Sequence, residues 1–297
     1  MPEHGPRRHL GKLVADTFCY WLANKMRARS RNHDDFQHIA VPINDLIGIR
    51  VFATGQFELT QFDAVKALLA SSDSILGVPI NRQGAFIDVG ANIGLYTIAF
   101  SRMFGRTIAF EANPATFKIL EANVALSRLD RVQRLCLGLS DEARDGIIYV
   151  PEDGNLGWAT LTPRSGIEPP TMEIAIKLDT LDNLAESLGL EAYPVSLIKI
   201  DVEGHELPVL HGASKLLMRW GPIVLFEALN DSIGGQCVGV LKDCGYSRFY
   251  RFRRAFDWRK GGLKGCLADL VLGLPVRYEE IDTAAGVHAP LVCAVRV

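Results

Sequence analysis

The sequence predicts an α/β fold in which a parallel sheet is covered by helices on both faces. From residue 85 onward, short apolar runs alternate with segments of helical periodicity, which is the pattern of parallel strands joined by crossover helices. Acidic residues follow several of these runs at the point where each run ends. The chain has 297 residues, of which 48% are hydrophobic, so it is long enough for one large domain or two small ones with a packed core.

The composition argues against several kinds of partner and compartment. A net charge of −2 gives no overall electrostatic reason to expect nucleic acid or an acidic membrane. No apolar segment reaches the roughly 18 residues that a membrane span needs, and the N-terminus lacks the apolar core of a signal peptide. The six cysteines show no metal-binding spacing and are expected to be reduced core thiols. We therefore expect a soluble, cytoplasmic protein.

The first 56 residues are predicted to form an N-terminal helical extension. Apolar residues recur at helical spacing over residues 10–28, and basic residues flank this segment. We expect this helix to pack on the domain or on a second subunit, as in a homodimer, and a helix on a membrane surface is the alternative. A short strand is predicted at 48–54, and a helix at 57–70 begins the main domain, which is assigned to residues 57–297.

The main domain is expected to contain seven sheet strands and an inserted β-hairpin. The strands are predicted at residues 85–89, 107–111, 132–139, 195–201, 222–228, 246–252 and 291–297. Between the third and the fourth, residues 146–150 and 172–178 alternate apolar and polar side chains, which indicates two paired strands. The long polar loop at 151–171 joins them, and loops of this length in a compact domain are more often functional than not.

Four of the predicted strands end in acidic residues. In an open α/β sheet the ligand binds in the crevice outside the carboxyl ends of the strands. The residues that lie there are Asp88, Gly90 and Gly94 after the first strand, Glu111 after the second, Asp201 and Glu203 after the fourth, and Glu227 after the fifth.

The turn after the first strand favours a positively charged ligand. It runs Gly-Ala-Asn-Ile-Gly and lacks one glycine of the G-x-G-x-x-G pattern that binds a pyrophosphate. Asp88 adds a carboxylate where the pyrophosphate would lie, which suits an ammonium or a sulfonium better. S-adenosylmethionine carries both cations, and Glu111 is placed to accept hydrogen bonds from the two hydroxyls of its ribose. A nicotinamide-dependent oxidoreductase is the alternative that these residues disfavour.

Three stretches resemble the FkbM-type S-adenosylmethionine-dependent methyltransferases. They are "FIDVGANIGLYT", "FEANPATFKILEANV" and "LIKIDVEGHELPVLHGA", of which the third is the most specific to that family. The resemblance covers roughly residues 57–252. It implies a Rossmann-like sheet of the class I methyltransferase type, S-adenosylmethionine as methyl donor, and O-methylation of a hydroxyl on a sugar, a glycan or a glycosylated or polyketide natural product.

The resemblance also implies roles for individual residues. Around the amino acid part of the cofactor it places Asp88, Gly90, Ala91, Asn92, Gly94 and Thr97. Glu111 would bind the ribose, and Ser140 and Asp141 would lie beside the adenine. Asp201 would face the reacting methyl together with Glu203, and would also contact the cofactor.

Methyl transfer to a hydroxyl needs alignment and a group that takes the proton. His205 is the candidate base by its ordinary pKa, and Glu203 is the alternative. His205 is also placed to cap the helix that follows, and Glu203 to bind the cofactor instead. Asp201 and Glu227 occupy positions where a magnesium-dependent enzyme would hold its ion, but two acids form an incomplete ligand shell, so no metal is expected. Glu227 is then expected to line the acceptor pocket.

Two further features concern the acceptor. Basic and aromatic residues are interleaved over 248–264, which fits a solvated strand edge, a lid over the acceptor or, less well, a site for nucleic acid. Trp158, in the long polar loop, is a candidate for stacking on an acceptor or for core packing. A protein that binds S-adenosylmethionine without turnover is a third possibility, but the acids of "KIDVEGHE" favour an enzyme.

Overall fold

The computed structural model describes residues 39–42, 47, 51, 59–151, 159–161, 171–228, 231–254, 276–283 and 286–297. The helix predicted at 10–28, Trp158 and most of the basic segment 248–264 lie outside these residues. The strand predicted at 48–54 is described only at Val51, which lies in a helix, so that prediction is wrong there. Within the described residues, no helix has the length and apolar character to cross a membrane.

Helices and strands alternate through the first half of the domain. The elements are α3 (Leu59–Leu76), β1 (Ala85–Val89), α4 (Leu95–Phe100), the short 3₁₀ helix η2 (Ser101–Met103), β2 (Arg106–Phe110), α5 (Pro114–Leu126) and β3 (Val132–Leu135). The alternation from β1 onward agrees with the sequence pattern, and α3 continues six residues past the predicted helix end, with non-helical backbone angles at Ser71.

The second half adds a small sheet and completes the large one. Its elements are β4 (Gly138–Leu139), β5 (Arg144–Pro151), β6 (Thr171–Asp179), α6 (Leu181–Leu184), β7 (Val195–Ile200), α7 (Glu206–His211), α8 (Ser214–Trp220), β8 (Ile223–Ala228), α9 (Asp231–Asp243), β9 (Arg248–Arg254), β10 (Val276–Glu280) and β11 (Ala289–Val295).

The large sheet is mixed rather than wholly parallel. Its eight strands follow the order β10-β9-β11-β8-β7-β1-β2-β3. The five strands from β8 to β3 pair in parallel, whereas β11 pairs antiparallel with both β8 and β9, and β10 pairs antiparallel with β9. The expectation of a parallel sheet is therefore correct for the half that carries the glycine turn and is corrected for the other half.

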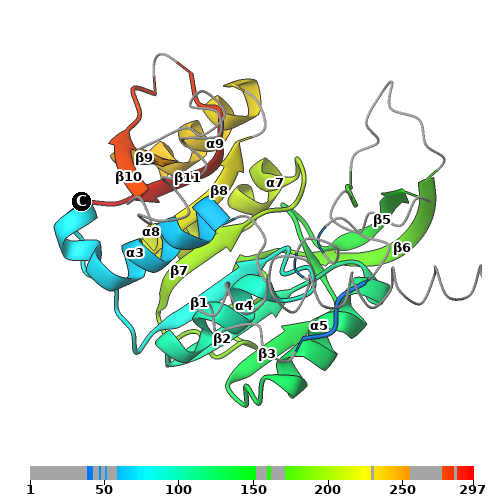
Figure 1. Cartoon of the computed structure of the whole chain (residues 1–297). Coiled ribbons are helices and arrows are strands. Elements are labelled where there is room, and N and C mark those ends of the chain that lie inside the picture. The colour runs from blue at the N-terminus through cyan, green and yellow to red at the C-terminus, as the bar shows by residue number, and fades with distance from the viewer. Residues whose placement is uncertain are drawn as a thin grey trace, which may run out of the picture.

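The predicted hairpin is confirmed, and it belongs to a second sheet. Strands β5 and β6 pair antiparallel over eight residues each, and β4 joins β6 in parallel. The strand predicted at 132–139 is accordingly two strands, because β3 belongs to the large sheet and β4 to the small one. Figure 1 shows β5 and β6 projecting from the side of the molecule away from β9, β10 and β11.

Helices cover both faces of the large sheet (Figure 1). On one face, α3, α4 and α5 bury side chains such as Leu68, Phe100 and Leu120 against the strands. On the other face, α7, α8 and α9 bury side chains such as Leu210 and Leu217. Every residue of β1 and β7 is buried, as expected for central strands of a sheet that is covered on both sides.

Candidate active site

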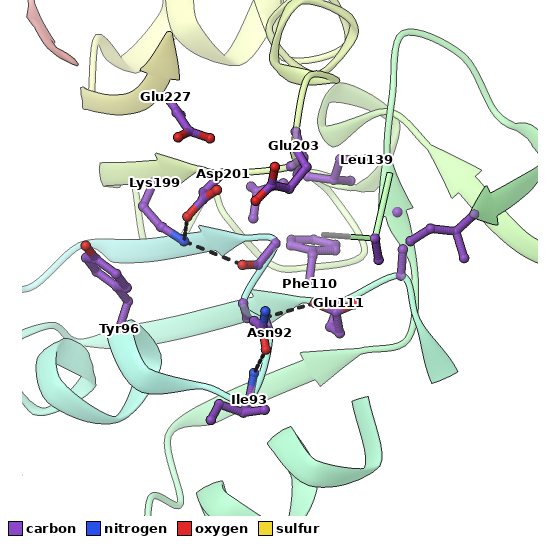
Figure 2. Close-up of a pocket in the computed structure, with 18 of the residues that line it drawn as sticks. Asn92, Ile93, Tyr96, Phe110, Glu111, Leu139, Lys199, Asp201, Glu203 and Glu227 are labelled. Carbon is purple, nitrogen blue, oxygen red and sulfur yellow. Dashed lines mark hydrogen bonds and ion pairs between the residues drawn. The ribbon is translucent and has the colours of Figure 1, made fainter. Parts of the chain in front are cut away.

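A cavity of about 230 Å³ lies at the carboxyl ends of β1, β2, β7 and β8. Its walls come from the turn after β1, from the ends of β2 and β7, from the segment between β3 and β4, and from Glu227 on β8 (Figure 2). Ile148 of β5 and the segment that pairs with it, Ala159 and Leu161, close one side. The crevice predicted from the sheet pattern is therefore present, and the small sheet forms part of its wall.

The turn after β1 is held against β2 and β7. The backbone N–H groups of Gly90 and Ala91 both donate to the carbonyl of Phe110, at 3.0 and 2.9 Å. Gly90 has a φ of +73°, and a Cβ placed there would lie 1.9 Å from the carbonyl oxygen of Asp201. Only glycine fits this close approach. The glycine thus lets the turn pack directly against the backbone at the end of β7.

Glu111 connects this turn to the start of α5. Its carboxylate accepts hydrogen bonds from the backbone N–H of Asn92 at 2.9 Å and of Asn113 at 2.8 Å. Asn113 caps α5 by accepting from the N–H of Ala115, and Pro114 is the first residue of the helix, as the sequence indicated. Burial raises the pKa of Glu111 to about 7, against the opposing effect of the two backbone donors. Its carboxyl group lies in the cavity wall.

The positive charge next to Asp88 is the side chain of Lys199 and not that of a ligand. Asp88 is fully buried, accepts a 2.6 Å hydrogen bond from the Thr97 hydroxyl, and lies 3.8 Å from Nζ of Lys199, its register partner on β7. Burial raises the pKa of Asp88, while Lys199 and the Thr97 hydroxyl lower it. Asp88 and Thr97 lie behind the cavity wall, so they support the turn from below, whereas the sequence suggested direct contact with a ligand.

Lys199 is a charged residue of the cavity that the sequence did not single out. Its Nζ lies 3.0 Å from a carboxylate oxygen of Asp201 and 3.5 Å from the carbonyl of Gly90, and 4.6 Å from the centre of the Tyr96 ring. Its side chain is only 4% exposed. The signal was a single lysine inside an apolar strand, two residues before Asp201 and therefore on the same face of β7.

Three carboxyl groups converge at one end of the cavity. One oxygen from each of Asp201, Glu203 and Glu227 lies within 4.8 Å of the others, and Figure 2 shows these side chains around one space above Lys199. Like charges at this separation repel one another, and Lys199 beside Asp201 offsets part of that repulsion. The sequence suggested Asp201 and Glu227 as a pair, and the structure adds Glu203.

His205 lies outside the cavity lining, and its buried side chain is hydrogen-bonded to buried Ser140. The Ser140 hydroxyl donates to Asp141 at 2.9 Å and lies 3.0 Å from Nε2 of His205. With the single hydroxyl hydrogen directed at Asp141, the matching tautomer of His205 donates from Nε2 to the hydroxyl, and in that tautomer Nε2 does not take a proton from a substrate. Burial lowers the pKa of His205. His205 occupies the N-cap position of α7 without a capping hydrogen bond from its side chain.

The structure thus divides the residues that the sequence singled out. Those that line the cavity are Gly90, Ala91, Asn92, Glu111, Asp201, Glu203 and Glu227. Those that lie behind or beside it are Asp88, Gly94, Thr97, Ser140, Asp141 and His205. The helix expected after His205 is divided into α7 and α8 at Gly212 and Ala213.

Known proteins share the motif-bearing part of the chain. The family model described as "Methyltransferase FkbM domain" matches residues 88–248. Methyltransferase sdnD of Sordaria araneosa is 30% identical over 188 residues, 54% of this chain and 72% of that protein. Methyltransferase 1 of Beauveria bassiana is 30% identical over 154 residues, 45% of this chain and 60% of that protein.

The similarity to a solved structure is weaker. The crystal structure of methyltransferase FkbM from Methylobacillus flagellatus aligns with a TM-score of 0.36 at 16% identity, over 70% of this chain and half of that chain. The match to the family model extends from Asp88 in β1 to the first residue of β9 and includes the glycine turn, Glu111 and all three carboxyl groups of the cluster. The chain therefore belongs to the FkbM methyltransferase family.

Proposed function

We propose that this methyltransferase transfers a methyl group from S-adenosylmethionine to a hydroxyl group of a sugar, a glycan or a glycosylated or polyketide natural product. The observation that carries the proposal is the position of Glu203, whose carboxylate enters the cavity beside those of Asp201 and Glu227. An alcohol is a weak nucleophile with a high pKa, so a carboxylate in contact with the acceptor can take its proton as the new bond forms.

The cavity fits the proposed cofactor at its other end. The backbone of Gly90 lines the cavity, and Glu111 offers carboxylate oxygens that accept hydrogen bonds from a ribose diol. Asp201 supplies a negative charge for an ammonium or sulfonium group, and its orientation is fixed by Lys199. When bound, S-adenosylmethionine would supply a methyl group on a positively charged sulfur, which leaves as a neutral thioether.

The residues of the chain then have separate tasks. Glu203 accepts the proton of the acceptor hydroxyl, while Asp201 and Lys199 fix the cofactor side of the cavity. Glu227 lies opposite, on β8, and orients the acceptor by accepting a second hydrogen bond from it. This assignment prefers Glu203 over His205 as the base, because Nε2 of His205 is engaged with Ser140. Four expectations from the sequence stay predictions. They are the stacking of an acceptor on Trp158, a homodimer through residues 10–28, the domain boundary after residue 56 and a cytoplasmic location.

Transfer of labelled methyl to a panel of acceptors tests this proposal. The panel contains free sugars, O-glycosides, nucleotide sugars and hydroxylated polyketides, with amine and thiol analogues of each. We expect label on oxygen, and a loss of roughly 100-fold or more in kcat for Glu203→Gln, since general base catalysis contributes that much. Glu186→Gln, which changes an exposed glutamate away from the cavity, is the matched control. Label on nitrogen or sulfur alone, or full activity of Glu203→Gln, would contradict the proposal.

A further inference from the structure

We propose that Glu206 is a positioning residue whose buried carboxylate holds the loop between β7 and α7 so that Glu203 points into the cavity. The inference deepens the proposed function and rests on it, because it concerns the orientation of the proposed base. Glu206 belongs to the sequence motif, but neither the sequence reasoning nor the cavity lining singles it out.

The loop that carries Glu203 has an unusual backbone. Glu203 has a φ of +52°, and the next residue, Gly204, has a φ of +100°. A residue with a Cβ rarely adopts the left-handed region, and it does so in a native protein only where the surroundings enforce it. The direction of the Glu203 side chain therefore depends on contacts that keep this turn closed.

Glu206 provides two of these contacts. Its Oε1 accepts hydrogen bonds from the backbone N–H groups of Val202 and Gly204, both at 3.2 Å, which are the amides on either side of Glu203. The side chain is fully buried. The Val202 N–H lies in the peptide unit between residues 201 and 202, and the Gly204 N–H lies in the unit between residues 203 and 204. One acceptor that binds both N–H groups therefore restrains the backbone angles of Val202 and Glu203 together, and with them the direction of the Glu203 Cβ.

Burial of this carboxyl group has a cost that the contacts offset only in part. Desolvation raises the pKa of Glu206, and the amides of Val202 and Gly204 lower it. Its second oxygen, Oε2, has no hydrogen-bond partner among the described residues. Oε1 is therefore the oxygen through which this side chain contacts the loop.

Two other groups hold the same loop from the small sheet. The Thr160 hydroxyl donates to the carbonyl of Glu203 at 3.1 Å, and His205 is hydrogen-bonded to Ser140 at the end of β4. The loop is therefore held by Glu206 of α7, by Ser140 after β4 and by Thr160, which pairs with β5. Glu206 is the only one of these groups that contacts the amides on both sides of Glu203 among the residues described.

Glu206→Gln and Glu206→Leu separate positioning from a general structural role. The glutamine keeps an acceptor oxygen for both amides, whereas leucine keeps the volume and removes it. For Glu206→Leu we expect hydrogen exchange of the Val202 and Gly204 amides to accelerate more than about 10-fold, as for loss of hydrogen bonds to a charged group. Glu206→Gln should stay within about 3-fold of wild type. Amide exchange is measured by NMR without any acceptor.

The same variants are then compared in binding and turnover. Glu206→Leu should lower kcat by about 100-fold, since displacement of a reacting group by 1 Å can cost that much. Its Kd for S-adenosylmethionine, measured by calorimetry, should stay unchanged. Glu206→Gln should retain most of the wild-type kcat. Asp182 is the matched control, because its carboxylate also accepts from two backbone amides, those of Lys215 and Leu216, at the start of α8. Asp182→Leu should lower stability without lowering kcat.

The possible results distinguish this inference from the proposed function. If Glu203→Gln abolishes transfer but Glu206→Leu retains it, Glu206 does not position the base and the inference is wrong. If Glu203→Gln retains transfer, Glu203 is not the base and the proposed function is contradicted, together with the inference that rests on it, whatever the amide exchange of Glu206→Leu shows. Should Glu206→Leu not fold, Glu206→Asp shortens the side chain by one methylene and draws the acceptor away from the two amides, and we expect about 10-fold lower kcat with the same Kd. Unchanged kcat in a folded Glu206→Asp variant whose Val202 and Gly204 amides exchange faster would overturn the inference.

Discussion

Glu111 has a pKa close to neutrality because its carboxyl group is buried at the junction of β2 and α5. Desolvation raises that pKa to about 7, although two backbone amides stabilise the charged form. The folded protein then binds more protons than the unfolded chain between pH 4.5 and 7, so the contribution of Glu111 to stability falls as the pH rises through this range. Only the ionised carboxylate accepts hydrogen bonds with both oxygens from a ribose diol.

Binding of S-adenosylmethionine should therefore strengthen as the pH rises from 6 to 8. A carboxyl group with a pKa of about 7 is roughly one-tenth ionised at pH 6, so we expect about a tenfold decrease in Kd over this range. Calorimetry at the two pH values measures it, and Glu111→Gln controls for titration of the ligand's own amino group. A Kd for wild type that is the same at both pH values, or the same dependence in Glu111→Gln, would contradict the assignment of Glu111.

Lys199 is predicted to hold two acids together. Replacement by methionine keeps the length of the side chain but leaves Asp88 buried without its cation, so we expect a loss of about 3 kcal/mol or more in the free energy of unfolding. Urea denaturation at pH 7 measures this loss. The double variant Lys199→Met with Asp88→Asn should regain part of it, because the uncompensated buried charge is then removed. If the double variant is no more stable than Lys199→Met, the loss in the free energy of unfolding does not come from the uncompensated charge of Asp88.

At the scale of elements, the start of α5 connects a helix cap to the cavity wall. Asn113 caps the helix through its side chain and donates its own N–H to Glu111. Asn113→Ala removes the cap and should cost about 1 kcal/mol in the free energy of unfolding, whereas Asn113→Ser keeps an oxygen in place and should cost less. Urea denaturation compares the two. Equal losses would indicate that the cap does not stabilise α5.

The elements that the sequence predicted well are those with a local signal. The glycine turn follows from Gly90 and Gly94, the α5 start from Asn113 and Pro114, and the central strands from their continuous apolar residues. Periodicity shows that a run is a strand, but it does not show which neighbour the strand pairs with or in which direction. For this reason β11 was not predicted to pair antiparallel with β8, and the change of sheet between β3 and β4 was missed.

The site was predictable in part for the same reason. Acids that follow strands are visible in the sequence, and Glu111, Asp201, Glu203 and Glu227 all reach the cavity. The depth of a side chain is set by packing from both faces, so Asp88 could not be recognised as buried beneath the turn. Lys199 was missed because its role depends on the β1–β7 register, which places it opposite Asp88.

At the scale of the whole molecule, the order of strands assembles the cavity. Strands β1 and β7 are separated by more than a hundred residues in sequence but pair directly, and β8 follows β7 in the sheet. This order brings Glu227 of β8 within 4.8 Å of Asp201 and Glu203, which follow β7. The net charge of −2 is a total over the chain, whereas three carboxyl groups gather at one end of the cavity. Local charge, rather than the total, therefore determines which ligand the cavity suits.

A crystal structure of the chain in complex with S-adenosylmethionine tests the central claim most directly. We predict that both ribose hydroxyls lie within hydrogen-bond distance of Glu111, with the amino acid part against Gly90 and the methyl group directed at the space between Glu203 and Glu227. A ligand bound away from Glu111, or one whose methyl group faces away from the three carboxyl groups, would contradict the account.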